Sequence, residues 1–149
     1  MAYTNAYSAY RETSIKTASQ GQLIVMLYDG AVKNLDQAII LIAQKKSQSK
    51  SDPGIIEKIG KAVIRAQEII TELTVSLDFD AGEDIAKNLF SLYTFFNQEL
   101  LEANVRFDGD RIKVVRDMIK SLRDSWQIIA QKESTSGGIA QGIALNIAS

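Results

Sequence analysis

The 149-residue sequence contains no cysteine and no histidine. Without cysteine there is no disulfide framework and no thiol chemistry. Without histidine the chain lacks the usual general base, the commonest metal ligand and the phosphohistidine relay. A di-metal carboxylate bundle with Glu-x-x-His pairs and a covalently attached haem of the C-x-x-C-H type are excluded for the same reason. Any activity would rest on carboxylates, lysines and hydroxyls alone, so we predict a protein that is not an enzyme and needs no cofactor or metal.

Strong charge and long hydrophobic runs are also missing. The formal net charge of −1 argues against a protein that holds nucleic acid through phosphate contacts. No apolar run approaches the ~18 residues of a membrane span, and residues 1–12 lack the basic region and apolar core of a secretory signal. We therefore expect one cytoplasmic domain that neither binds nucleic acid nor inserts into a membrane.

The acidic segment DFDAGED at residues 78–84 superficially resembles a calcium-binding loop. Asp78 and Asp80 fit its first and third positions. Glu83 stands where the loop needs glycine, however, and Leu89 stands where it needs a bidentate glutamate. The segment is therefore interpreted as a helix-capping turn.

The most prominent stretch that is present is a broad amphipathic helix over residues 19–43. Ser19 and Gln22 form a capping box at its start. Its main apolar positions recur at helical spacings: Leu23, Leu27, Leu35, Ala38 and Ile42. Val25, Met26 and Tyr28 widen this face, so more than one neighbouring helix is needed to cover it.

Three further amphipathic helices follow, each with its own start signal. Asp52 as N-cap with Pro53 at the first helical position predicts the second helix. Asp80 and Glu83 predict a capping pair for the third, and Asp108 is the N-cap expected for the fourth.

Apolar residues recur at alternating spacings of three and four in these helices, which favours antiparallel packing at about 20°. The predicted inward positions are Ile55, Ile59, Ala62, Ala66, Ile69 and Leu73, then Ile85, Leu89, Leu92, Phe96, Leu100 and Ala103, then Ile112, Val115, Ile119, Leu122, Trp126 and Ile129. Because the connections are short, sequential helices should be antiparallel neighbours. The sequence predicts an all-α, antiparallel up-down-up-down four-helix bundle over residues 19–132, with a short N-terminal helical segment.

The two ends of the chain differ from this pattern. Tyr3, Tyr7 and Tyr10 share one face of a helical segment within residues 1–18, which is too short to be stable without docking. The segment is either a frayed terminus or a flap over an apolar groove. Residues 133–149 are rich in glycine and are predicted to form a flexible tail.

Two polar features leave alternatives open. Residues 45–65 hold six cations and two anions, whereas residues 66–104 hold one cation and eight anions; these are either solvated faces or patches that steer a partner. Asn88 and Asn104, in the third helix, are either exposed polar positions or amides that hydrogen-bond a partner's backbone.

Three blocks of the sequence resemble the motifs of the flagellar secretion chaperone family, FliS. They are TASQGQLIVMLYDGAVKNLDQA, LDFDAGEDIAKNLFSLYTFFNQELLEANVRFD and RDMIKSLRDSWQII. The N-terminal AYSAYRETSIKTAS fits as well, so that the resemblance covers Tyr3 to Gln131. Gln20 stands where the family commonly has proline, and Ala81-Gly82 replaces a commoner Gly-Gly.

The resemblance implies a helical bundle that binds the disordered C-terminal region of flagellin, one to one, in the cytoplasm. Binding would prevent premature polymerisation, and the complex would be passed to the flagellar export gate. The N-terminal segment would cover part of the groove in the unbound state. The contacts carried over by motif are Tyr7, Tyr10, Ile15, Leu23, Leu27, Tyr28, Asn88, Leu92, Tyr93 and Asn104. The alternative function is a self-associating helical scaffold.

Overall fold

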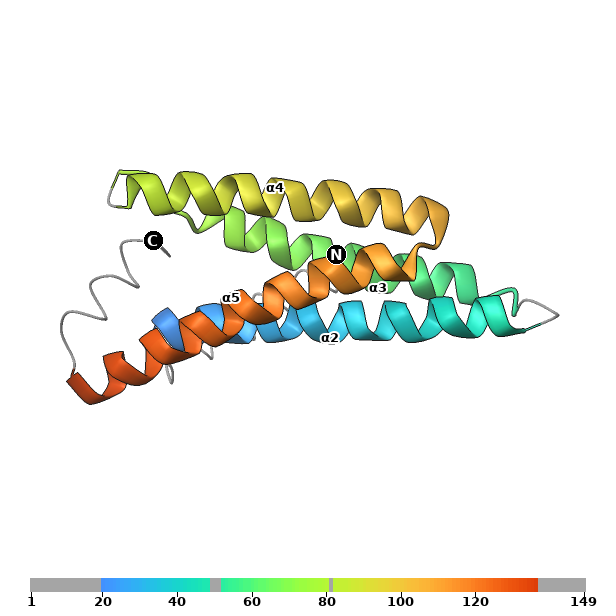
Figure 1. Cartoon of the computed structure of the whole chain (residues 1–149), viewed down its shortest axis with the longest axis horizontal. Helices are drawn as coiled ribbons and strands as arrows, with labels where there is room; N and C mark the ends of the chain where they lie inside the picture. The colour runs from blue at the N-terminus through green and yellow to red at the C-terminus, as the bar shows by residue number, and fades with distance from the viewer. Residues whose placement is uncertain (1–19, 49–51, 81, 137–149) are drawn as a thin grey trace.

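The computed structural model describes residues 20–48, 52–80 and 82–136. These residues form four helices: α2 (Gln20–Ser47), α3 (Ile55–Val75), α4 (Glu83–Arg106) and α5 (Gly109–Ser136). Consecutive helices run in opposite directions along one long axis (Figure 1). The predicted all-α, up-down-up-down four-helix bundle is confirmed. Helix α5 continues to Ser136, beyond residue 132, where we placed the end of the bundle.

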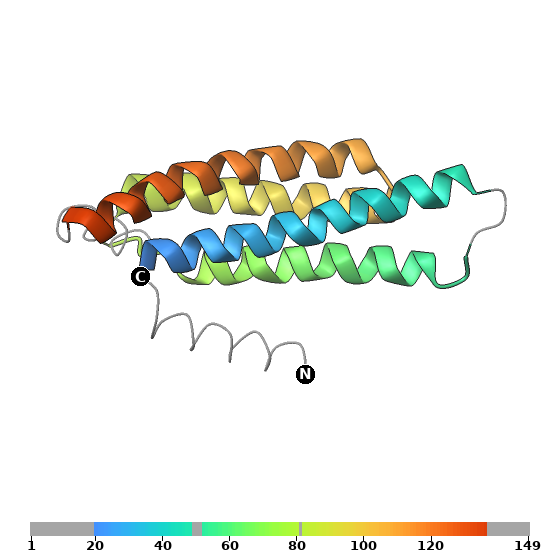
Figure 2. The same ribbon diagram turned by 90° about the horizontal axis from the view of Figure 1, so that it is seen from below.

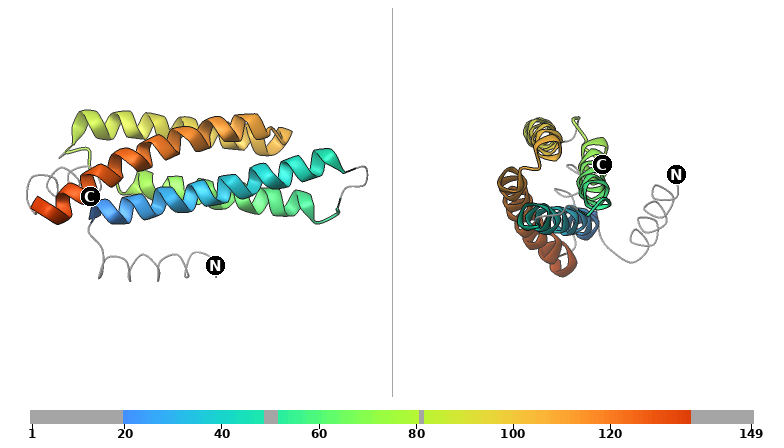
Figure 3. Two further views of the ribbon diagram at one scale, coloured as in Figure 1. Left: turned by 60° about the horizontal axis from the view of Figure 1, so that its bottom comes forward. Right: turned by 90° about the vertical axis from the view of Figure 1, so that its right-hand side faces the viewer.

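Each helix packs against two neighbours. Helix α2 contacts α3 and α5, and α4 contacts the same two helices from the other side. Figures 2 and 3 show this arrangement, with α2 and α4 at opposite corners of the bundle in the end-on view. The first and last of the four helices, α2 and α5, also contact each other, and α5 crosses α2 obliquely (Figure 1).

The apolar seams predicted from the sequence form most of the core. All five main positions of α2 and all six of α3 are buried. In α4 the prediction is wrong at Ile85, which is 49% exposed, and Leu92 is only partly buried. Ala86 and Tyr93 face the core in their place. In α5 Trp126 is buried as predicted, while Leu122 and Ile129 pack at the edge of the core.

The helix starts confirm one capping prediction and correct two. Asp108 caps α5, because its Oδ1 accepts a hydrogen bond from the Arg111 N–H at 3.1 Å. The Asp52 carboxylate instead accepts from the Gly54 N–H at 2.9 Å. It therefore closes a turn containing Pro53, and α3 begins two residues later than predicted, at Ile55.

The predicted Asp80–Glu83 capping pair is wrong. Helix α4 begins at Glu83 after Gly82, which has no side-chain cap. The Asp78 carboxylate accepts from the Asp80 N–H at 3.0 Å, and Glu83 pairs with Lys87 at 2.9 Å on the same helix. The residue pattern of a capping box was present, but Asp78 turns the chain before the helix starts, so Asp80 does not reach the cap position.

Candidate functional site

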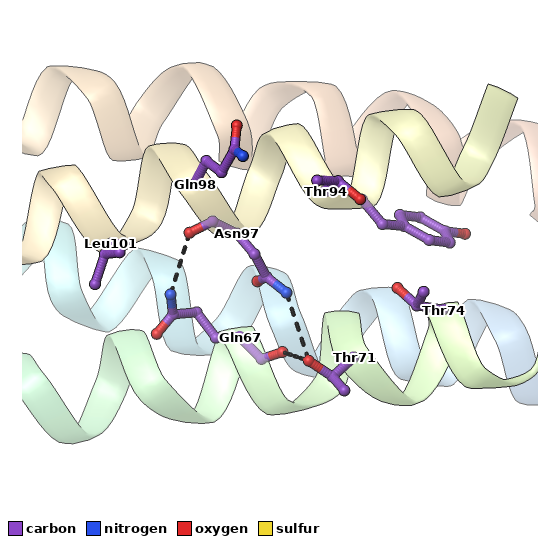
Figure 4. A pocket seen from close by; sticks show the side chains of 8 residues that line it. Gln67, Thr71, Thr74, Thr94, Asn97, Gln98 and Leu101 are labelled. Atoms are coloured by element: carbon purple, nitrogen blue, oxygen red, sulfur yellow. Dashed lines mark hydrogen bonds between the residues drawn. The ribbon is translucent and has the colours of Figure 1, made fainter. Parts of the chain in front are cut away.

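A groove of about 480 Å³ runs between α3 and α4 on the surface of the bundle (Figure 4). Helix α3 contributes three polar side chains at helical spacing: Gln67, Thr71 and Thr74. Helix α4 contributes Tyr93, Thr94, Asn97, Gln98 and Leu101. None of these lining residues is charged. The groove is therefore uncharged, and its polar groups sit among apolar side-chain atoms.

Hydrogen bonds between the two helices set the geometry of the groove. The Gln67 side-chain amide donates to the Asn97 backbone carbonyl at 3.2 Å. The Asn97 side-chain NH₂ donates to Thr71 Oγ1 at 3.4 Å, and the Thr71 hydroxyl donates to the Gln67 carbonyl at 2.9 Å. All three bonds are drawn in Figure 4. The two bonds of Asn97 bridge α3 and α4, and the Thr71–Gln67 bond lies within α3.

Exposed apolar side chains lie along α4, and one of them, Leu101, lines the groove. Leu101 is 59% exposed at one end. The helical period places Phe90 on the same stripe of α4, seven residues before Asn97. The ring of Phe90 packs edge-to-face on Phe79, with centroids 5.9 Å apart, and both rings are partly exposed. Exposed apolar side chains on the same face of α4 as the polar groups of the groove are suited to a polypeptide segment.

Tyr93 links this groove to the bundle interior. Its side chain is buried, and its hydroxyl hydrogen-bonds the hydroxyl of Tyr28 on α2. Burial raises the pKa of Tyr93 to about 12. Burial also raises the pKa of Tyr28 well above its usual value, and the charge of Tyr93 acts in the same direction. A hydrogen bond with the Trp126 side chain acts against this increase. Both phenols are therefore neutral at ordinary pH.

The structure separates the predicted contact residues into three groups. Leu23, Leu27, Tyr28 and Tyr93 are buried in the bundle. Leu92 and Asn104 are partly buried and Asn88 is exposed. Tyr7, Tyr10 and Ile15 lie outside the described residues.

Of the seven predicted residues that the structure describes, only Tyr93 lines the groove. Asn88 and Leu92 share the stripe of α4 that carries Glu99, and Glu99 pairs with Arg111 of α5 at 3.7 Å. That stripe is on the side of α4 away from α3. Asn104, in contrast, continues the groove stripe one turn beyond Leu101.

Sequence reasoning missed most of the groove residues. A signal did exist, because Gln67, Thr71 and Thr74 recur at i, i+4 and i+7, as do Thr94, Asn97 and Leu101 at i, i+3 and i+7. Each stripe by itself looks like an ordinary solvent-facing edge. Only the packing of α3 on α4 brings the two stripes together.

Other kinds of site are not found in the part of the chain that the structure describes. No three acidic side chains there gather closely enough to hold a metal ion. Among the described helices, none combines the length and apolar character that crossing a bilayer requires.

The fold and the groove place the chain in the class of four-helix bundle proteins with an open helix–helix groove. Residues 3–133 match the family model described as flagellar protein FliS. A flagellar secretion chaperone FliS of Bacillus subtilis is 30% identical over an alignment of 144 residues, and the match covers 94% of this chain and all of the relative. The chain belongs to the FliS family of flagellar secretion chaperones.

Enterobacterial relatives agree with this assignment. A flagellar secretion chaperone FliS of Salmonella typhimurium is 34% identical over 124 residues, covering 83% of this chain and 85% of the relative. Its counterpart in Escherichia coli is 31% identical over 126 residues, covering 83% and 86%. All three relatives have chaperone names, and the matches extend over most of each chain.

Proposed function

We propose that this protein is a cytoplasmic export chaperone that binds the disordered C-terminal region of flagellin, one to one. The observation that carries the proposal is membership in a chaperone family together with an open groove between α3 and α4. Binding prevents premature polymerisation of flagellin, and the complex is then delivered to the flagellar export apparatus. No catalytic step is part of this function.

The groove supports recognition of a helical segment. A disordered client that folds on binding loses conformational entropy, so it needs a large contact area. The α3–α4 groove supplies part of that area, and a client helix buries its apolar face against Phe90 and Leu101, which are 46% and 59% exposed. The remainder comes from other faces of the bundle, which the client wraps.

The motif residues contribute to this proposal in different ways. Asn88, Leu92 and Asn104 have accessible side chains and are proposed to contact flagellin directly. Leu23, Leu27, Tyr28 and Tyr93 are buried; in the described conformation they support the binding surface from beneath. Tyr7, Tyr10 and Ile15 are proposed to belong to an N-terminal flap that competes with flagellin.

Sedimentation velocity of the full chain, with and without a C-terminal fragment of flagellin, tests the proposal. We expect a monomer that converts to a 1:1 complex, and no complex with an N-terminal fragment of flagellin as the control. Oligomers that grow with protein concentration and ignore the C-terminal fragment would support the scaffold function instead. Exposed apolar side chains such as Ile40, which is 58% exposed, make that second outcome physically reasonable.

A further inference from the structure

Four apolar residues that the sequence predicts for the core lie at its edge instead. Ile85 of α4 is 49% exposed. Leu92 of α4 is only partly buried, as are Leu122 and Ile129 of α5. Apolar surface that stays in contact with water contributes nothing to stability, so each of these side chains would gain from a further neighbour.

An ion pair shows that these four residues share one surface. Glu99 of α4 pairs with Arg111 of α5 at 3.7 Å, so the sides of the two helices that carry this pair face each other. Apolar residues continue both sides at helical spacing away from the pair. They are Phe95, Leu92 and Ile85 on α4, and Met118, Leu122 and Ile129 on α5. We name these six residues the α4–α5 apolar face.

The two helices diverge along this face. They lie close together at the end with the Glu99–Arg111 pair and separate toward the other end, where α5 crosses α2 (Figures 1 and 3). Ile85 lies at the separated end, which explains why it is exposed although its spacing predicts burial. Helix α5 ends at Ser136, at this same end of the bundle. The apolar face therefore widens toward the point from which the chain continues.

The sequence of residues 137–149 is suited to cover the face, although these residues lie outside the described ones. Ile139, Ile143 and Ile147 recur every four residues, which places them on one side of a helix. Residues 137–149 contain no charged side chain. Packing them on the apolar face therefore removes no side-chain charge from water.

The length of this segment also matches the face. Gly137 and Gly138 allow the chain to reverse its direction directly after Ser136. Residues 139–149 would then span about 16 Å as a helix, whereas Ile85 and Phe95 are separated by about 15 Å along α4. The segment is therefore long enough to run back along the whole face.

The other end of the chain is less suited to this position. Residues 1–19 also lie outside the described residues, and they precede α2, which occupies the corner of the bundle opposite α4 (Figure 3). They contain the charged residues Arg11, Glu12 and Lys16. Packing those side chains on an uncharged face would cost hydration without an ion pair in return.

We infer that residues 137–149 fold back as a helix and pack Ile139, Ile143 and Ile147 on the α4–α5 apolar face. The glycines that predict a flexible tail weaken this helix, so the contact is reversible. Leu92 belongs to the face and is also proposed to contact flagellin, so bound flagellin displaces the segment. The displacement rests on the proposed function, whereas the docking does not.

Paramagnetic broadening in NMR spectra of the full chain tests the docking. The chain has no cysteine, so Ser149→Cys provides a single site for a nitroxide spin label. Amide signals of residues 85–95 in α4 and 118–129 in α5 should lose intensity. Signals of residues 58–65 in α3, toward the other end of the bundle, should not.

Substitutions in the labelled chain separate docking from random encounters of a flexible tail. Ile143→Asp places a charge on the packed side of the predicted helix and should restore the lost signals. Gln141→Asp is the matched control, because it adds the same charge on the opposite side, and the signals should stay broadened. On the bundle, Ile85→Asp should restore the signals. Ile128→Asp should not, because Ile128 is 55% exposed and lies outside the face.

Three results would overturn the docking: no broadening in residues 85–95, equal broadening with Ile143→Asp and Gln141→Asp, or equal broadening with Ile85→Asp and Ile128→Asp. The same spectra show whether each variant is folded. If Ile85→Asp is unfolded, the comparison of Ile143→Asp with Gln141→Asp decides.

Adding the C-terminal fragment of flagellin to the labelled chain tests the displacement. The lost signals should return as the fragment binds, with binding measured separately by calorimetry. A fragment that binds while the broadening persists overturns the displacement. A fragment that does not bind overturns the proposed function and leaves the docking to be judged by the variants.

Discussion

The hydroxyls of Tyr28 and Tyr93 form a hydrogen bond inside the bundle, although the two residues are 65 positions apart. Tyr28 belongs to α2 and Tyr93 to α4, which occupy opposite corners of the bundle (Figure 3). Both side chains are buried, so this hydrogen bond pairs polar atoms that are shielded from water. This pair connects the two diagonal helices and lies directly beneath the groove, through Tyr93.

Tyr93→Phe should destabilise the fold by about 1–3 kcal/mol, because the buried hydroxyl of Tyr28 loses its partner. Urea unfolding followed by circular dichroism measures the change. The double variant Tyr28→Phe/Tyr93→Phe should cost less than the sum of the two single variants, since no half of the pair remains unsatisfied. Strict additivity would show that the hydroxyls do not interact.

Stability should fall in alkali because of the same pair. Burial raises the pKa of Tyr93 to about 12, whereas an unfolded tyrosine titrates near 10. Between these two pH values the folded state keeps a proton that the unfolded state releases. The contribution of Tyr93 to the free energy of unfolding is therefore fully present below about pH 10 and is lost as the pH rises to about 12. Tyr93 alone accounts for roughly 2–3 kcal/mol. Unfolding midpoints between pH 8 and 12 measure this; a flat profile for wild type, or a steep one for the double Phe variant, contradicts it.

Trp126→Ala should cost about 3–5 kcal/mol, because the indole is 5% exposed and packs within the core of the bundle. Thermal unfolding measures the loss. Ile128→Ala, two residues further on, is a matched control because Ile128 is 55% exposed, and its midpoint should barely change. An unaltered midpoint for Trp126→Ala would show that α5 does not pack as described.

The ion pairs between α2 and α5 should contribute little. Arg116 and Asp36 approach to 2.6 Å, and Arg123 and Asp29 to 2.9 Å, but these side chains are partly solvent-exposed. Asp36→Asn should therefore destabilise the fold by no more than ~1 kcal/mol at low salt. The difference should vanish in 1 M salt, where screening is strong. A loss of several kcal/mol that persists in high salt would mean that the pair is effectively buried.

Deleting residues 1–14 tests the proposed N-terminal flap. If this segment competes with flagellin, a flap held by ~1.4 kcal/mol weakens apparent affinity about tenfold, and its removal restores that factor. Calorimetry with the C-terminal fragment measures the gain. Hydrogen exchange of the full chain gives an independent readout, because amides of residues 5–15 should lose protection when the fragment is added. Unchanged or increased protection would refute competition.

The groove illustrates how much of a site sequence patterns can reveal. The polar stripes of α3 and α4 are visible as periodic positions, and Asn104 extends the second one. Their pairing depends on how far α3 and α4 are shifted along each other, which core packing and the turn around Asp78 decide. Two hydrogen bonds join Asn97 of α4 to Gln67 and Thr71 of α3, and no single segment encodes them.

The sequence by itself determined the four helices, their order and most of their inward faces, because an amphipathic helix has to bury its apolar stripe whatever its neighbours are. The six predicted core positions of α3 are all buried for this reason. Periodicity could not choose between the adjacent residues Leu92 and Tyr93, since both are apolar enough to face a core. Only the tertiary structure decided for Tyr93, because its hydroxyl meets that of Tyr28 across the bundle while Leu92 needs no polar partner.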